Sequence, residues 1–196
     1  MKKILIVITL MAGCASTFAQ GKTKLALRAG VNSSKILNSN LHSKAAPYAG
    51  LALAIQFNEI YALQPEITYS KQGGKSETFG IDDIDINYLS ISVANKIFTK
   101  GQGFHFIFGP GLDFNFDDNF INLVNQNGDS FKITPIDIAL IGGIGYEFDF
   151  GLALELRYKQ GLIDLDFNDD GEYGSNNEKS QLNRAIQMGV LYKLNF

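Results

Sequence analysis

The chain has 196 residues, of which 45% are hydrophobic and 19% are charged, and its formal net charge is −3 at pH 7. This length suits one domain, and the composition excludes both a disordered chain and a helical membrane protein. A net acidic chain without a basic patch excludes nucleic acid as an expected partner.

The first predicted element is a secretory signal peptide at residues 1–19. It has two lysines, a short apolar run and small residues before a cleavage position after Ala19. The apolar run is too short to cross a membrane as a helix. The predicted domain therefore comprises residues 20–196. A competing interpretation takes residues 10–14 as a lipoprotein cleavage box in which Cys14, the only cysteine, is acylated.

The rest of the chain alternates between apolar and polar residues with a period of two, which is typical of strands whose two faces lie in different environments. The clearest case is the last one, where apolar side chains take every even position from Ile186 to Phe196. Eight strands are predicted, at residues 24–32, 47–57, 60–71, 84–97, 103–116, 133–148, 151–162 and 181–196.

The predicted connections alternate between long and short. Polar segments at 33–46, 72–83, 117–132 and 163–180 are long, whereas tight turns join the other strands. This asymmetry indicates an up-and-down barrel with short periplasmic turns and long external loops. Pro65 lacks a backbone N–H, so we expect it to mark a bulge in the third strand.

The distribution of charge predicts which face of the strands meets lipid. Gly and Ala concentrate on the polar face, and the apolar face carries bulky Leu, Ile and Phe, with aromatic residues near the strand ends. The charged residues of the polar face are Arg28, Glu66, Lys96, Asp113, Asp137, Glu147, Glu155, Arg157, Lys159 and Lys193. A soluble lipocalin-like binding barrel is the alternative, but it would expose an apolar band far larger than a few hundred Å². We therefore predict an all-β, eight-stranded antiparallel up-and-down transmembrane β-barrel surrounded by outer-membrane lipid.

The last strand carries a predicted membrane-insertion signal. Tyr192, Leu194 and Phe196 share its apolar face, and an aromatic residue at the end of the closing strand is typical of barrels that the outer-membrane insertion machinery recognises. The expected partners are thus outer-membrane lipid, this machinery and an unidentified protein bound through the external loops.

Five stretches of the chain resemble the PorT-like outer-membrane β-barrel family. They are RAGVN at 28–32, LQPEITYSKQG at 63–73, YLSI at 88–91, GPG at 109–111 and LRYKQGL at 156–162. Ser92 departs from the family pattern, which usually has Pro at this place. The resemblance implies an eight-stranded outer-membrane barrel. It implies no single activity, although one family member is linked to protein secretion across the outer membrane.

The strongest candidate site is a network of charges inside the barrel. Counting along the strands places Arg28, Glu66 and Arg157 near mid-height and facing inward, with Glu155 one step away. A charge inside a narrow barrel must be paired and hydrogen-bonded. We hypothesise that Glu66 bridges the two arginines. An eight-stranded barrel is only wide enough for side chains, so this network would plug its interior.

Enzyme activity is not expected. Small outer-membrane enzymes place His with Ser or acidic residues at the outer rim, and the chain has only His42 and His105. His105 falls near a predicted periplasmic turn, which is the opposite end. A rim-active hydrolase or acyltransferase is the alternative function.

A weak metal-site candidate lies in the last predicted loop, and no cofactor is expected. Asp166, Asn168 and Asp170 match the first half of a calcium loop, D-x-[DN]-x-[DN]-G. The twelfth position should be Glu and is Asn177. Asn and Asp are also the residues that a solvated loop uses.

Overall fold

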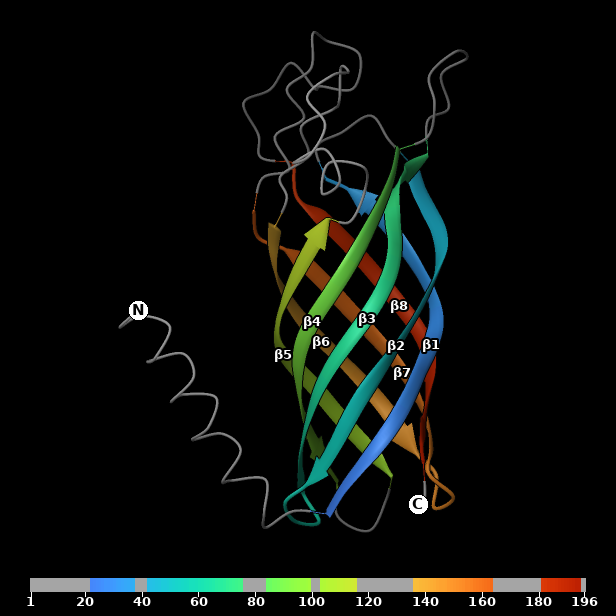
Figure 1. The fold of residues 1–196 in the computed structure, drawn as a ribbon, viewed down its shortest axis with the longest axis vertical. Coiled ribbons are helices and arrows are strands. Elements are labelled where there is room, and N and C mark those ends of the chain that lie inside the picture. Colours follow the sequence, from blue (N-terminus) through green and yellow to red (C-terminus); the bar gives the residue numbers. More distant parts are fainter. Residues whose placement is uncertain are drawn as a thin grey trace, which may run out of the picture.

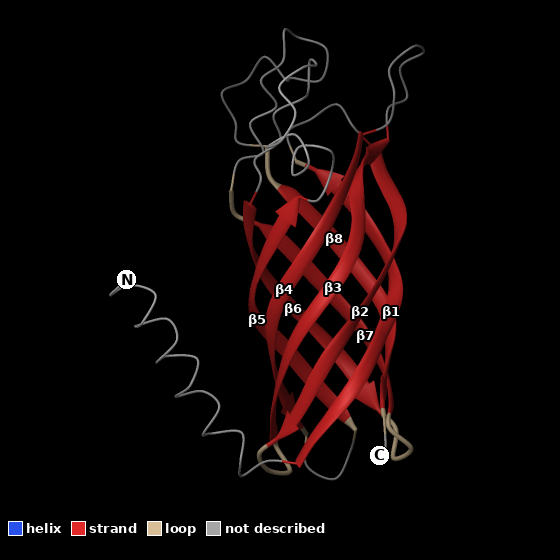
Figure 2. Cartoon of the chain, viewed as in Figure 1, coloured by secondary structure: helices blue, strands red, loops and turns tan. Residues whose placement is uncertain are grey.

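The computed structural model describes residues 22–37, 42–75, 84–99, 103–115, 136–163 and 181–194. They form eight strands: β1 (Lys22–Ile36), β2 (His42–Gln56), β3 (Tyr61–Lys75), β4 (Ile84–Phe98), β5 (Phe104–Asn115), β6 (Ile136–Glu147), β7 (Leu152–Gly161) and β8 (Asn183–Lys193). Each strand pairs antiparallel with the next, and β8 pairs with β1, so the sheet closes on itself. Figures 1 and 2 show the tilted strands forming one cylinder. The predicted eight-stranded antiparallel barrel is confirmed.

Successive side chains point to opposite faces of this closed wall. On the outside, Leu27, Phe106 and Met188 have exposed fractions of 48%, 50% and 67%. On the inside, Lys96 and Arg157 are each 1% exposed. The wall therefore has an apolar outer surface and a polar lumen, because the period-two pattern keeps each kind of residue on one face.

The first three strands extend farther into the predicted long loops than the sequence suggested. β1 continues to Ile36 and β2 begins at His42, so a connection of residues 37–41 replaces the predicted loop 33–46. The polar residues of this region remain in the wall because they hydrogen-bond across the lumen. The Ser34 hydroxyl, for example, donates to the Gly73 carbonyl at 3.1 Å. Their polarity reflected an inward position in a strand.

The predicted bulge at Pro65 is wrong. Pro65 pairs with Val93 of β4 in regular register, and the register between β2 and β3 is the same on both sides of it. The missing N–H therefore weakens the ladder locally without shifting it. The register shift between these strands lies in β2, between Ser43 and Tyr48.

The two ends of the barrel differ. The turns at 57–60, 99–103 and 148–151 lie at one end, the short-turn end, where β1 also begins and β8 ends (Figure 1). The other four connections lie at the opposite end, the long-loop end. Most of their residues, including 116–135 and 164–180, fall outside the described part of the chain.

Aromatic rings gather near the short-turn end. The rings of Phe104 and Phe106 meet edge to face at 5.3 Å, and Phe148 packs with Tyr146 and Phe150 at 5.0 and 5.5 Å. Such rings suit the boundary between hydrocarbon and water.

No helix in the described ranges has the length and hydropathy needed to cross a membrane.

Candidate functional site

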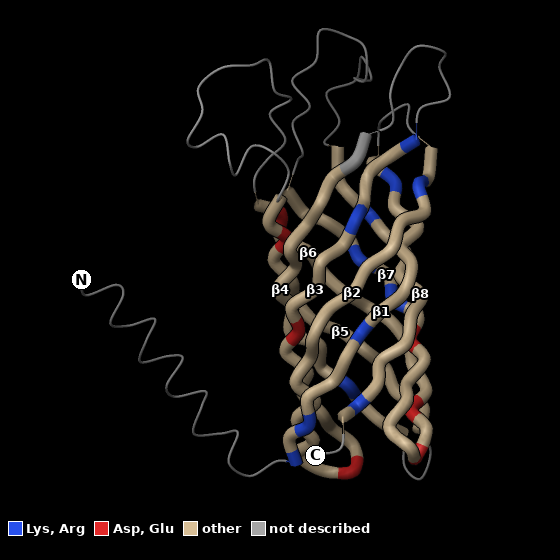
Figure 3. Tube along the Cα trace, turned by 45° about the vertical axis from the view of Figure 1, so that its right-hand side comes forward, with Lys and Arg blue, Asp and Glu red and all other residues tan. Residues whose placement is uncertain are grey.

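The candidate site is the charged lumen of the barrel. Lysines, arginines and acidic residues occur along the strands over much of the height of the wall (Figure 3). Those that face inward form two clusters and one separate pair, Lys193 with Glu147 at 2.5 Å near the short-turn end. The central cluster consists of Arg28, Glu66, Lys96, Glu155 and Arg157, and the loop-end cluster consists of Asp113, Asp137 and Lys159.

Glu66 on β3 is bound by both arginines of the central cluster. Arg157 on β7 donates two hydrogen bonds to its carboxylate, of 2.9 and 2.8 Å, and Arg28 on β1 donates a third of 2.9 Å. Gln64 and Ser92 add hydrogen bonds of 2.5 and 3.3 Å. The paired Arg157 contacts have the fork geometry that makes arginine–carboxylate pairs strong and directional.

Glu155 on β7 is the second carboxylate of the central cluster. Its oxygens lie 2.6 Å from the Lys96 ammonium and 2.7 Å from an Arg157 nitrogen, and Arg28 Nε is 3.6 Å away. The structure thus brings together Arg28, Glu66, Glu155 and Arg157, and it adds Lys96. Lys96 was predicted to face inward, but nothing local indicated that β4 and β7 would place it beside Glu155.

Burial makes this pairing necessary. The five side chains of the central cluster are at most 3% exposed. An isolated charge in such an environment costs several kcal/mol, and pairing offsets that cost only when the geometry and further hydrogen bonds are good. Every charge of the central cluster has an oppositely charged neighbour, although Arg28 Nε and Arg157 Nε donate no hydrogen bond.

Tyr48 on β2 is a member of the lumen that the sequence analysis did not single out. Its ring lies 4.9 Å from the Arg28 guanidinium, a cation–π contact. A Cβ at Gly30 or Gly189 would overlap the Tyr48 hydroxyl, so these glycines of β1 and β8 make room for the ring. The alternation of the second strand could have found it, because Tyr48 shares a face with Gly50.

A chain of neutral polar groups leads from Arg28 toward the long-loop end. Arg28 contacts the Gln187 side-chain oxygen at 3.4 Å, and the Gln187 amide nitrogen donates to Asn32 at 2.9 Å. Asn32 continues to Ser70 on the far side of β2. The lumen is therefore occupied by side chains that are hydrogen-bonded to one another.

The loop-end cluster is built differently. Lys159 on β7 donates to Asp113 at 2.6 Å and to the Ser90 hydroxyl at 3.1 Å. Asp137 on β6 stands directly opposite Asp113 on β5. One Asp137 oxygen accepts hydrogen bonds from the backbone N–H groups of Leu162 and Ile163, at 3.2 and 3.0 Å.

His105 lies at the short-turn end, as the sequence predicted. Its side chain is fully buried, its Nδ1 is 3.0 Å from the Gly103 carbonyl, and its ring packs at 4.7 Å against Phe98. His42 is instead the first residue of β2, at the long-loop end. The two histidines are therefore at opposite ends of the barrel.

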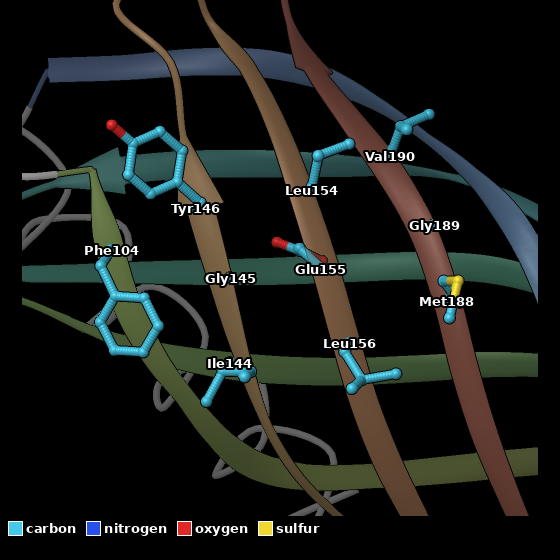
Figure 4. A pocket seen from close by; sticks show the side chains of 10 residues that line it. All are labelled: Phe104, Ile144, Gly145, Tyr146, Leu154, Glu155, Leu156, Met188, Gly189 and Val190. Carbon is cyan, nitrogen blue, oxygen red and sulfur yellow. The ribbon is translucent and has the colours of Figure 1, made fainter.

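The outer wall has a shallow apolar depression of about 500 Å³ over β5–β8. Figure 4 shows Phe104, Leu154 and Met188 standing around it, with Gly145 and Gly189 between them. Its lining belongs to the apolar outer surface. We assign it no function.

The structure describes only some of the other predicted site residues. Tyr192 points outward with 43% exposure, and the Leu194 N–H donates to the Leu25 carbonyl at 2.8 Å. Phe196 and the calcium-loop candidates Asp166, Asn168 and Asp170 lie outside the described residues. Within the described ranges, no group of three or more His, Cys, Asp or Glu side chains is arranged to hold a metal ion.

A closed antiparallel barrel with an apolar outer band and charged, hydrogen-bonded contents defines the class of transmembrane β-barrels. A family match of the sequence supports the same class. Residues 18–166 match the outer membrane protein beta-barrel domain family, and the chain belongs to that family. It is therefore a protein of the outer membrane of a Gram-negative bacterium.

Solved structures with the same fold have low sequence identity to this chain. Neisserial surface protein A is 17% identical, with a TM-score of 0.50, and the match covers 88% of this chain and 97% of that one. The attachment invasion locus protein Ail of Yersinia pestis is 13% identical, with a TM-score of 0.50 and coverages of 89% and 99%. The outer membrane enzyme PagL is 12% identical, with a TM-score of 0.51 and coverages of 86% and 99%. At these identities the likeness establishes the fold alone. No curated protein matches this chain.

Proposed function

We propose that this protein is a PorT-like outer-membrane barrel with a plugged interior, which acts through its external loops as a structural or interaction protein and is connected to protein secretion or envelope maintenance. The evidence for a plugged interior is the central cluster. Glu66 on β3 is held by Arg28 on β1 and by Arg157 on β7, the strand across the barrel from β3, so the bonds span the lumen. A continuous water path would have to break these contacts, which are buried and charge-assisted.

Planar bilayer recordings test the plug. We expect the wild-type barrel to show no stable conductance. The double variant Arg28→Ala/Arg157→Ala removes two bulky side chains from the same level and should conduct intermittently. A large, steady wild-type conductance would show an open pore and refute the proposal.

The proposal assigns no catalytic role to the barrel. The supporting observation is the position of His105, which packs against Phe98 at the short-turn end and lies within 4.0 Å of Glu155, a residue already bound by Lys96 and Arg157. A lipid-hydrolysis or acyl-transfer activity that disappears in the His42→Ala variant would instead support the rim-active alternative.

The proposed topology places the signal peptide and both chain ends on the periplasmic side, with the long loops outside. An epitope tag inserted at residues 171–174, between β7 and β8, should bind antibody on intact cells. The matched control is the same tag in the Asn58–Glu59 turn at the short-turn end, which should bind only after the outer membrane is broken. The reverse result would invert the topology.

Cross-linking on intact cells tests the interaction role. A photo-reactive residue in the loop between β7 and β8 should capture a protein, and the same residue at Glu59 in the short turn should not. Equal capture at both places would point to non-specific contact and would argue against a loop-mediated function.

A further inference from the structure

Two carboxylates face each other inside the long-loop end of the barrel. Asp113 and Asp137 are opposed in the β5–β6 ladder, and both are fully buried. Like charges directly opposite on paired strands are destabilising, and a buried charge needs a partner. Lys159 supplies only one positive charge, 2.6 Å from Asp113. The loop-end cluster therefore has one negative charge in excess.

The same cluster contains oxygen atoms that no donor uses. Asp113 Oδ2 and Asp137 Oδ2 are buried and have no hydrogen-bond partner. Asn183, the first residue of β8, adds a third such atom: its nitrogen donates to Gln72 at 2.7 Å, but its Oδ1 has no partner. These residues are 0%, 0% and 3% exposed. Buried acceptors without donors are costly and rare. The missing partner must be a cation or a hydrogen-bond donor, since every unused atom here is an acceptor, and a cation would also offset the excess negative charge.

Gly161 explains how oxygens from β6 and β8 reach a common space. This residue lies on β7, between those strands. A Cβ at Gly161 would overlap Asp137 Oδ2 and would stand 3.0 Å from the Asn183 carbonyl oxygen. The missing side chain thus leaves space over β7 that the carboxylate enters and that the carbonyl borders.

We propose that Asp113 and Asp137, together with oxygens of Asn183, bind a hard divalent cation at the long-loop end of the lumen, and that Ca²⁺ is the ion that suits this site best. Ca²⁺ accepts six to eight oxygens in irregular geometry, from carboxylates, amide and backbone carbonyls and water, whereas Mg²⁺ demands a near-ideal octahedron. Zn²⁺ would prefer His or Cys ligands, which this cluster does not offer.

The bound ion would join β5, β6 and β8 near the end of the wall where the longest connections begin. It would also neutralise the excess negative charge of the loop-end cluster. This site is distinct from the sequence motif at Asp166, Asn168 and Asp170, and it rests on described residues only.

The test uses substitutions that remove charge and preserve structure. Asp137→Asn keeps an oxygen that can accept the Leu162 and Ile163 N–H bonds, so the end of β7 stays anchored while the charge is lost. Asp149→Asn is the matched control, because it removes the same charge from an exposed turn at the short-turn end. The double variant Asp166→Asn/Asp170→Asn removes the loop motif.

The measurement is the heat-unfolding midpoint of the full barrel in detergent, with chelator and then with rising Ca²⁺. Binding to the folded state alone raises the midpoint progressively with free cation. We expect this rise in the wild type, in Asp149→Asn and in the loop double variant, and we expect Asp137→Asn to lose it. Lys159→Gln should shift the rise to lower Ca²⁺ concentrations, because it removes the cation that competes for Asp113.

Two results would overturn the proposal. A wild-type midpoint that does not change with Ca²⁺ would mean that a proton or water satisfies the carboxylates. A rise that persists in Asp137→Asn and disappears in the loop double variant would assign the cation to the loop motif.

Discussion

The central cluster and the loop-end cluster are both buried and both charged, yet they are satisfied to different degrees. All four carboxylate oxygens of Glu66 and Glu155 lie within 2.9 Å of an arginine or lysine nitrogen. In the loop-end cluster, each aspartate has one oxygen with no partner. The central cluster has three cations for two carboxylates, and the loop-end cluster has one cation for two. Both clusters are buried, so burial does not distinguish them. The pairing of charges does: it is complete for the carboxylates of the central cluster and incomplete in the loop-end cluster, which therefore suits a ligand.

Removing the carboxylate at the middle of the central cluster should have the largest effect. Glu66→Ala leaves Arg28 and Arg157 facing each other, so we expect it to lower the free energy of unfolding by about 3–5 kcal/mol, the usual cost of breaking a buried ion pair. Urea unfolding in detergent measures it. An unchanged midpoint would refute the pairing.

Two variants sharpen that result. Glu59→Ala, which removes an exposed carboxylate from the β2–β3 turn, should leave the midpoint unchanged. Replacing Arg28, Glu66 and Arg157 together by apolar residues of similar volume should cost much less than Glu66→Ala, because Glu155 keeps its pair with Lys96 and no isolated charge remains.

Removing a cation from the central cluster should cost less than removing a carboxylate. Lys96→Met leaves two arginines with two carboxylates, and Glu155 retains its contact with Arg157. We expect a loss of about 1.5–3 kcal/mol, the range for a hydrogen bond to a charged group. A loss equal to that of Glu66→Ala would show that charge balance within the cluster does not matter.

The smallest effect should have the opposite sign. Without added cation, Asp137→Asn relieves the repulsion between facing carboxylates and should raise the free energy of unfolding by about 0.2–1 kcal/mol. Chemical unfolding in the presence of chelator measures it against Asp149→Asn. Destabilisation by Asp137→Asn would mean that its charge is already compensated in the free protein.

Local pattern was sufficient for much of this structure. The alternation around Arg28, Glu66 and Arg157 predicted that all three face the lumen, and the outward position of Tyr192 followed from the same rule. Local pattern failed where polarity had two possible causes. Ser34 is polar because it faces the lumen in β1, yet its polarity led to its assignment to a loop.

The number of strands, the face each residue takes and the lipid-exposed band follow from local pattern, because alternation along one strand needs no partner. Which inward residues meet depends on the folded barrel. It placed Lys96 against Glu155, 59 positions apart, Tyr48 over Gly189, and Asp113 opposite Asp137. Those encounters depend on how far each strand is displaced along its neighbour, and that displacement is set by the closure of the whole hydrogen-bonded wall.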